Sequence, residues 1–170
     1  NNKKLKIANL RYFNPVGAHM SGLIGENPNS KPTNLFPIIS NVAKRETEYL
    51  SIFGNDWPTK DGTCIRDYIH VMDLADAHLD TLDFLIRNNP QIISLNIGTG
   101  NGTSVLEIIN KFMEVNNILV PYKFKDRRKG DACHLVADNS LAIETLKWNP
   151  KRNLADMCFD SWKYINFSSL

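Results

Sequence analysis

Four basic residues lie where the sequence predicts turns or the start of a strand, and their chemistry suits a diphosphate. Arg66 directly precedes the predicted strand Asp67-Tyr-Ile-His70, whereas Arg127, Arg128 and Lys129 lie beside Gly130-Asp131. A diphosphate presents paired oxygens that the planar fork of arginine binds bidentately, whereas lysine offers only a point charge. A basic run is also typical of a solvated surface, so the spacing alone leaves both interpretations open.

A glycine-rich segment, Ile97-Gly-Thr-Gly-Asn-Gly-Thr103, follows a predicted strand and precedes a predicted helix. This is the setting of a dinucleotide-binding loop, and Asp126 falls about where a ribose-binding acid would lie. However, Thr103 takes the third glycine position, where a β-branched side chain hinders close packing of helix on strand. We therefore interpret the segment as a tight turn followed by a capped helix.

Two motifs of nicotinamide-dependent enzymes are absent from the sequence. Neither GxGxxG nor GxxGxxG occurs, and none of the five tyrosines has a lysine four residues later. We therefore expect no catalytic residue in this chain, with the reaction chemistry supplied by residues outside it. A start at Asn1 rather than Met agrees with a truncated piece of a longer protein.

Histidine and aspartate residues offer little evidence for a metal site. Asp73, Asp76, Asp80 and Asp83 recur every three or four residues along a predicted helix, which is typical of a solvated face with acid near the helix N-terminus. His70 lies three residues before Asp73 without a visible third ligand, and a lone histidine is usually a structural donor. We assign no metal.

The composition is that of an ordinary globular protein with one domain and one core. The 170 residues are 42% hydrophobic and 22% charged, with a formal charge of +2, so no general affinity for nucleic acid or membrane follows. No apolar run approaches the ~18 residues of a membrane span. Cys64, Cys133 and Cys158 form no CxxC motif, which argues against a disulfide framework or zinc site and favours a reducing cytoplasm.

Hydrophobic periodicity predicts an α/β fold. Residues 17–33 hold three Gly and two Pro and predict a long loop that is more typical of function than of a passive connection. Ser104 and Glu107 form a capping box at the start of one helix. Besides 67–70, the predicted strands are 5–13, 49–53, 93–97 and 122–125, and the predicted helices are 35–44, capped by Thr33 or Asn34, 71–87, one opening at 104, 141–147 and 154–165.

Several motifs together give the chain a resemblance to a known family. They are Arg11-Tyr-Phe-Asn-Pro-Val-Gly-Ala-His19, Thr33-Asn-Leu-Phe-Pro37, Ile52-Phe-Gly-Asn-Asp56, the block 61–74, Asn96-Ile-Gly-Thr-Gly100 and Arg127-Arg-Lys-Gly-Asp131. Over essentially its whole length the chain resembles the C-terminal half of the UDP-glucose (UDP-galactose) 4-epimerases, which are extended short-chain dehydrogenase/reductases. The resemblance implies that residues 1–170 form a single substrate-binding lobe that adds late strands to a Rossmann-type parallel sheet.

The resemblance also implies where the ligands lie. The NAD-binding lobe with its catalytic Ser, Tyr and Lys would precede Asn1, the substrate would be a UDP-hexose, and the full-length protein would be a homodimer. The implied contacts are Tyr12 and Pro15 with the nicotinamide, Asn14 with the sugar diphosphate, Asn34 and Leu35 with the nucleotide, Phe53 with uracil, Arg66 and Arg128 with the diphosphate, Asp131 with ribose, and Leu135 with the hexose.

The implied reaction inverts C4 of the hexose through a 4-keto intermediate, and the isolated chain would be inactive. Leucine at position 135 is intermediate in size, which leaves open whether plain or N-acetylated hexoses are accepted. A dehydratase or decarboxylase of the same fold and a non-catalytic nucleotide-binding module stay as alternatives. Because the strand from Leu5 to Phe13 would lack neighbours, we also expect exposed apolar surface and a tendency to associate.

Overall fold

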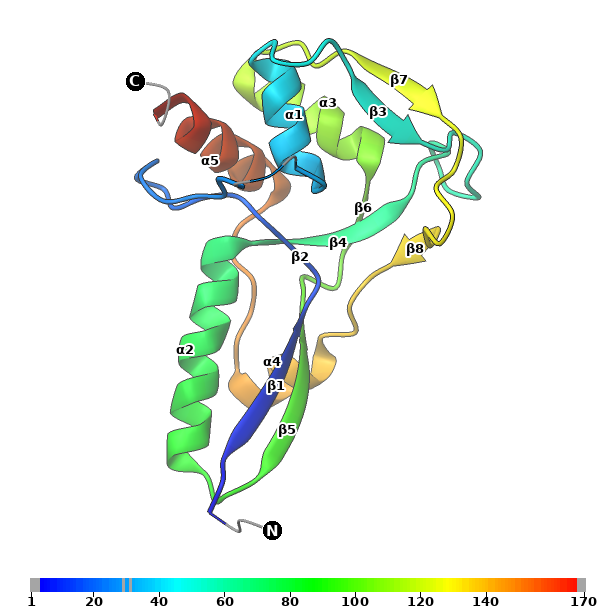
Figure 1. The fold of residues 1–170 in the computed structure, drawn as a ribbon. Helices are drawn as coiled ribbons and strands as arrows, with labels where there is room; N and C mark the ends of the chain where they lie inside the picture. The colour runs from blue at the N-terminus through cyan, green and yellow to red at the C-terminus, as the bar shows by residue number, and fades with distance from the viewer. Residues whose placement is uncertain (1–3, 29, 31, 168–170) are drawn as a thin grey trace.

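The computed structural model describes residues 4–28, 30 and 32–167, which form two stacked parts (Figure 1). The strands are β1 (Ile7–Tyr12), β2 (Asn14–Val16), β3 (Leu50–Phe53), β4 (Ile65–His70), β5 (Ile92–Ile97), β6 (Gly102–Ser104), β7 (Tyr122–Lys125) and β8 (His134–Leu135). The helices are α1 (Leu35–Ala43), α2 (Val71–Arg87), α3 (Val105–Asn116), α4 (Ser140–Leu146) and α5 (Leu154–Phe167). No helix within these ranges has the length and hydrophobicity that crossing a bilayer requires.

The lower part in Figure 1 is an α/β unit built on a parallel strand pair. Strands β1 and β5 run in register from the pair Ile7 and Ile92 to the pair Tyr12 and Ile97, with α2 against β1 and α4 against β5. The upper part holds α1, α3 and α5 together with the parallel pair of β3 and β7. Strand β4 crosses between the two parts and pairs with β2, β6 and β8.

Buried apolar residues form two clusters, so the expectation of one core is wrong. The upper cluster includes Ile39, Ile52 and Phe112, and the lower one includes Ile69, Leu95 and Trp148. Composition sets how much apolar surface can be buried, whereas the path of the chain decides how that surface is divided.

Most predicted elements are confirmed, including the α/β class, but three short strands were missed. The capping box of α3 is present with both of its hydrogen bonds, and Ile108, Ile109 and Phe112 are fully buried. Asn34 occupies the N-cap of α1, although its side chain donates to Glu26 Oε1 instead of capping the helix. The predicted strand 5–13 corresponds to β1, and β2 follows directly after Phe13, where it pairs with β4 and not with β5. Strands β6 and β8 have too few residues to show a periodicity.

Helix α2 has the predicted bounds but not the predicted faces. Asp73 on the expected solvated face is fully buried, whereas Leu82 on the same helix is 56% exposed. The Asp73 carboxylate accepts hydrogen bonds from the backbone N–H groups of Lys151 and Arg152 and from Arg152 Nη1 at 2.6 Å. The interpretation of all four aspartates as solvated is therefore wrong for Asp73, because its partners lie almost 80 residues away in sequence.

The expectation of exposed apolar surface is confirmed in the lower part. Within the described residues β1 pairs with β5 alone, which leaves its other edge open. The exposed apolar side chains of β1, α2, β5 and the residues just before β1 include Leu5, Tyr12, Leu79, Leu82, Ile86 and Ile92. Whether this surface drives association stays a prediction.

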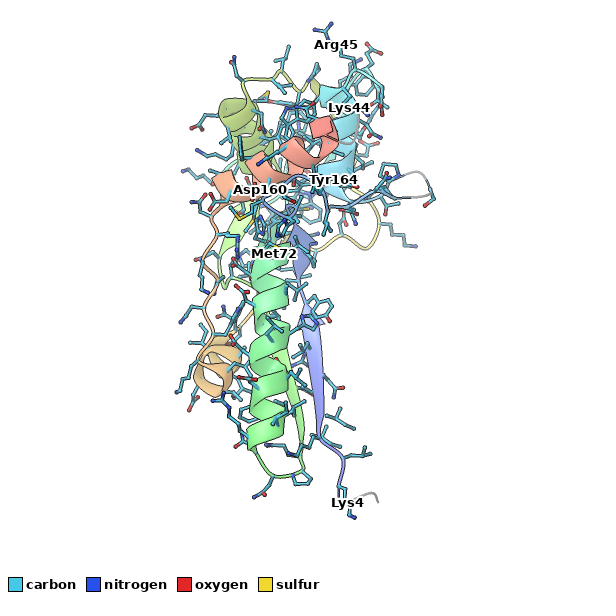
Figure 2. All side chains as sticks on the ribbon, turned by 90° about the vertical axis from the view of Figure 1, so that its left-hand side faces the viewer. Lys4, Lys44, Arg45, Met72, Asp160 and Tyr164 are labelled. Atoms are coloured by element: carbon cyan, nitrogen blue, oxygen red, sulfur yellow. The ribbon has the colours of Figure 1, made fainter. Side chains whose placement is uncertain are left out.

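His70 joins the two parts through buried polar contacts. Its Nδ1 accepts from the backbone N–H of Met72 and so caps α2, and its Nε2 lies 3.3 Å from Asp160 Oδ2 of α5. Figure 2 shows Met72 at the upper end of α2, where α5 carries Asp160 close by. These contacts require a neutral ring with its proton on Nε2. Burial and the charge of Arg152 lower the pKa of His70, opposed by Asp160 and Asp73.

We expect His70 to make stability fall in acid. Because the pKa of His70 is lowered on folding, the unfolded chain binds the proton first, and the free energy of unfolding decreases as pH drops below the unfolded pKa of about 6.5. His70→Asn keeps an acceptor that can cap α2. In this variant the free energy of unfolding should change less steeply with pH between pH 7 and 5, with a slope smaller by up to about 1.4 kcal/mol per pH unit. Urea unfolding over this range measures the slope, and the exposed His134→Gln is the control. An unchanged slope in His70→Asn would contradict this role.

Candidate functional site

A cavity of 350 Å³ opens in the upper part, between β2, the start of α1, β3 and β4. Its size lies within the range of small-molecule sites. Eight of the predicted site residues line it: Asn14, Pro15, Asn34, Leu35, Phe53, Arg66, Arg128 and Asp131. These residues come from five separate stretches of sequence, and the fold brings them to one place.

Asp131 holds the two predicted diphosphate-binding arginines together. Its carboxylate accepts from Arg128 Nε at 3.0 Å and lies 3.8 Å from Arg66 Nη2. Arg66 Nη1 also donates to the carbonyl oxygens of Ile65 and Ala132, at 2.9 and 2.7 Å. The Arg128 guanidinium lies over the ring of Phe53, 4.6 Å from its centroid. Two forked cations therefore share one cavity wall, with an aromatic ring beside one of them.

The neighbouring basic residues do not join them in the cavity. Arg127 donates to Asp56 through Nε at 2.7 Å and Nη2 at 2.6 Å, and it covers the ring of Trp57 at 4.0 Å. The hydrogen bond from Arg127 lowers the pKa of Asp56. Lys129 does not line the cavity either. Residues adjacent in sequence thus point to different partners, and spacing could not separate them.

A second hollow of 410 Å³ adjoins the cavity and contains the remaining predicted residues, Tyr12 and Leu135. The two hollows share Phe13, Asn14 and Arg66 in their walls. Leu135 is 51% exposed and pairs with Arg66 across β8 and β4. Arg66 therefore lies between the two hollows.

Tyr12 ends β1 in this second hollow. Its hydroxyl lies 2.7 Å from His78 Nε2 of α2, which orients the ring toward that helix. Since it ends a strand of a parallel pair, it lies where open α/β sheets bind ligands, beyond the carboxyl ends of their strands.

Strand β4 supplies cavity residues that the sequence analysis missed. Tyr68 lies in β4 two residues after Arg66, and Cys64 directly precedes the strand two residues before Arg66; all three line the cavity. Burial raises the pKa of Tyr68 to about 12. The period of two in a strand puts such residues on one face, so the prediction for Arg66 already contained the signal for Cys64 and Tyr68.

The glycine-rich loop between β5 and β6 holds an internal carboxylate. Asp67, fully buried in β4, accepts from the backbone N–H groups of Thr99 at 2.8 Å and Gly100 at 2.9 Å. A Cβ at Gly98 would lie only 2.6 Å from Asp67 Oδ2, so this approach requires glycine. Because Asp67 already occupies the donors of the loop, the structural interpretation is favoured over a dinucleotide site.

A family model described as GDP-mannose 4,6 dehydratase matches residues 1–160 of this sequence. The chain belongs to this family. Among curated relatives, it is 51% identical over 158 residues to the UDP-glucose 4-epimerase of Bacillus subtilis, covering 93% of this chain and 46% of that protein. The chain therefore spans about half the length of the curated relatives that it matches.

Solved structures of relatives share the fold closely. One is a UDP-glucose-4-epimerase from Stenotrophomonas maltophila with bound NAD and formylated UDP-arabinopyranose, with a TM-score of 0.94 and 49% identity over 98% of this chain and 49% of that one. Another is a UDP-glucose 4-epimerase from Bifidobacterium longum in complex with NAD+ and UDP, with a TM-score of 0.92 and 40% identity over 99% and 50%. The similarity to epimerases and the Rossmann-type fold class are thereby confirmed.

Asp67 should be essential for keeping β4 in place. The backbone N–H groups of Gly100 and Ala137 both donate to Asp67 Oδ2 in the structure. In Asp67→Asn an amide NH₂ at that position would face these N–H groups, so that donors would meet donors. We expect a loss of about 3 kcal/mol in the free energy of unfolding, measured with urea. Asp138→Asn removes an exposed carboxylate that accepts from Ser140, and its effect on the free energy of unfolding should be much smaller. Equal losses in the two variants would show that burial of Asp67 has no special weight.

Proposed function

We propose that this chain is the UDP-sugar-binding half of an NAD-dependent UDP-glucose 4-epimerase. The observation that carries the proposal is the meeting of all ten predicted contact residues in two adjoining hollows, with Arg66 between them. A nucleotide in the cavity beside α1 and β3 and a hexose in the second hollow would leave the diphosphate beside Arg66. The bound nucleotide sugars and UDP of the two structural relatives support the same class of ligand.

Each side chain has a role that its chemistry fits. Arg66 and Arg128 pair with the diphosphate, while Asn14, Asn34 and Leu35 contact the nucleotide sugar from β2 and the start of α1. Phe53 packs against uracil, and Asp131 orients both arginines and accepts from ribose. Tight binding of the non-reacting nucleotide keeps the intermediate positioned, whereas the hexose is held loosely enough to turn over.

The chain provides only part of a nicotinamide site. Pro15 lines the cavity, and Tyr12 lies in the adjoining hollow beyond the carboxyl ends of β1 and β5. NAD, when bound, would supply the hydride transfer at C4 of the sugar. Tyr12 and Pro15 fit one wall of a pocket for the nicotinamide ring, with the acid–base residues supplied by a preceding lobe.

The open strand edge of the lower part supports a preceding lobe. The open edge of β1 accepts a further parallel strand, and the exposed apolar residues of the lower part would be covered by the helices that accompany it. In this proposal residues 1–170 form one substrate lobe of a cytoplasmic homodimeric enzyme, and the chain alone is inactive.

A nucleotide-sugar dehydratase is the second candidate, because the matching family model carries that description. Curated relatives at 45–51% identity are UDP-glucose 4-epimerases, which favours epimerisation. An assay of the full-length protein with UDP-galactose and NAD decides between them. Formation of UDP-glucose supports the epimerase, whereas release of a 4-keto-6-deoxy sugar identifies a dehydratase.

Binding of UDP should depend on two arginines and not on the third. We expect Arg66→Lys and Arg128→Lys each to weaken UDP binding about 10- to 100-fold, because lysine cannot make the bidentate, charge-assisted contacts. Arg127→Lys is the matched control, since Arg127 contacts Asp56 and Trp57 outside the cavity, and its affinity should stay within about twofold. Calorimetry with UDP measures all three. If only Arg127→Lys lost affinity for UDP, the diphosphate would bind at Arg127 and not beside Arg66 and Arg128.

Leu135 should limit the size of the hexose. In Leu135→Tyr the larger ring enters the second hollow, so we expect any turnover of UDP-N-acetylglucosamine to be abolished while UDP-glucose is still converted. Steady-state assays of both sugars in the full-length enzyme provide the measurement, with Leu135→Ala as the variant that widens the hollow. If UDP-N-acetylglucosamine turnover is unchanged in Leu135→Tyr, the limiting wall lies elsewhere.

A further inference from the structure

Two cysteines lie side by side on neighbouring strands next to the proposed diphosphate site. Cys64 directly precedes β4, and Cys133 directly precedes β8. These strands run parallel with Ile65 opposite His134, and the backbone N–H of Ile65 donates to the carbonyl oxygen of Cys133 at 2.8 Å. The peptide groups that follow the two cysteines are therefore hydrogen-bonded to each other.

This register suits a disulfide between the two side chains. Neighbouring strands lie about 4.8 Å apart, within the Cα separation of roughly 4.4–6.8 Å that disulfides span. Residues opposite each other in a parallel pair project to the same face. Cys64 shares its face of β4 with Arg66, since both line the cavity, and Leu135 stands opposite Arg66 two residues after Cys133.

The two thiols differ in access. Cys133 is half-buried, whereas Cys64 is only 6% exposed, and burial raises the pKa of the Cys64 thiol. The third cysteine, Cys158, lies fully buried in α5 within the upper apolar cluster. Cys133 is thus the thiol that a reagent in solution reaches first, and Cys64 is placed to react with it.

We propose that Cys64 and Cys133 form a redox-reactive thiol pair that closes into a disulfide at the cavity wall. The oxidant is a low-molecular-weight disulfide of the glutathione type. The Cys133 thiolate attacks one sulfur of that disulfide, forms a mixed disulfide and releases one thiol. Cys64 then attacks the Cys133 sulfur, and the second thiol leaves. Overall the two cysteines lose two protons and two electrons, which the glutathione-type disulfide takes up as it becomes two thiols.

The position of the pair couples it to the neighbouring arginine. Arg66 Nη1 donates to the carbonyl oxygen of Ala132, which adjoins Cys133, and Arg66 Nη2 faces Asp131. A bond from Cys133 to Cys64 would therefore act on the segment that holds the guanidinium. Conversely, a ligand in the cavity covers Cys64 and should slow closure. This coupling rests on the proposed nucleotide site, whereas the thiol pair itself does not.

The test is oxidation of the intact protein with oxidised glutathione, followed by proteolysis without reduction and mass spectrometry. We expect one peptide that joins Cys64 to Cys133, with both thiols lost. Cys133→Ser should abolish it, and Cys64→Ala should stop at a glutathione adduct on Cys133. Cys158→Ser is the matched control and should leave the linkage unchanged. Phenylarsine oxide, which bridges close thiol pairs, should protect the same two residues from alkylation in the native protein.

The outcomes separate the two parts of the inference. If oxidation yields no Cys64–Cys133 peptide and phenylarsine oxide protects neither residue, the thiol pair is refuted. With UDP at ten times its dissociation constant, closure should slow about tenfold, since about one site in eleven is free. Normal closure that UDP fails to slow, in a protein shown by calorimetry to bind UDP, would overturn only the coupling. Absence of UDP binding would refute the proposed function and leave the disulfide standing.

Discussion

The buried carboxylate of Asp67 is the constraint on which the arrangement of the site depends. A charge removed from water must be matched by hydrogen bonds, and Asp67 accepts from Thr99, Gly100 and Ala137. These contacts tie β4 to the loop after β5 and to the segment after β8. Because side chains alternate along a strand, fixing Asp67 inward sends Arg66 and Tyr68 to the opposite face, which is the cavity.

Polar contacts also join the two parts of the molecule. The apolar clusters lie in separate parts, and the first turn of α2 connects them through His70 with Asp160 and Asp73 with Arg152. Both pairs link α2 to the C-terminal segment that ends in α5. Removing one partner of either pair leaves a polar group unpaired away from water, which costs more than a surface ion pair contributes. The cavity thus gains a defined position relative to β1 and β5.

Charge balance explains how two arginines stay ordered side by side. Without Asp131 their like charges would favour separation, whereas the shared carboxylate keeps Arg66 and Arg128 in one wall. Arg127 makes the same kind of contact with Asp56 but on another surface. A diphosphate would meet a pair of forks already oriented, so less conformational entropy is lost on binding.

The sequence by itself determined the local structure and the kind of chemistry. Periodicity located β3, β5 and α3, because each of them buries one face, and the Ser104–Glu107 capping box is a local interaction. Residue types pointed to arginine forks, and the motif resemblance pointed to the right family. Only the tertiary structure decided that Asp73 is buried, that Asp67 fills the glycine loop, that the core is divided and that Arg127 faces away from the cavity. Each of these depends on a partner at least 30 residues distant or on the direction of a side chain, and neither is encoded in local spacing.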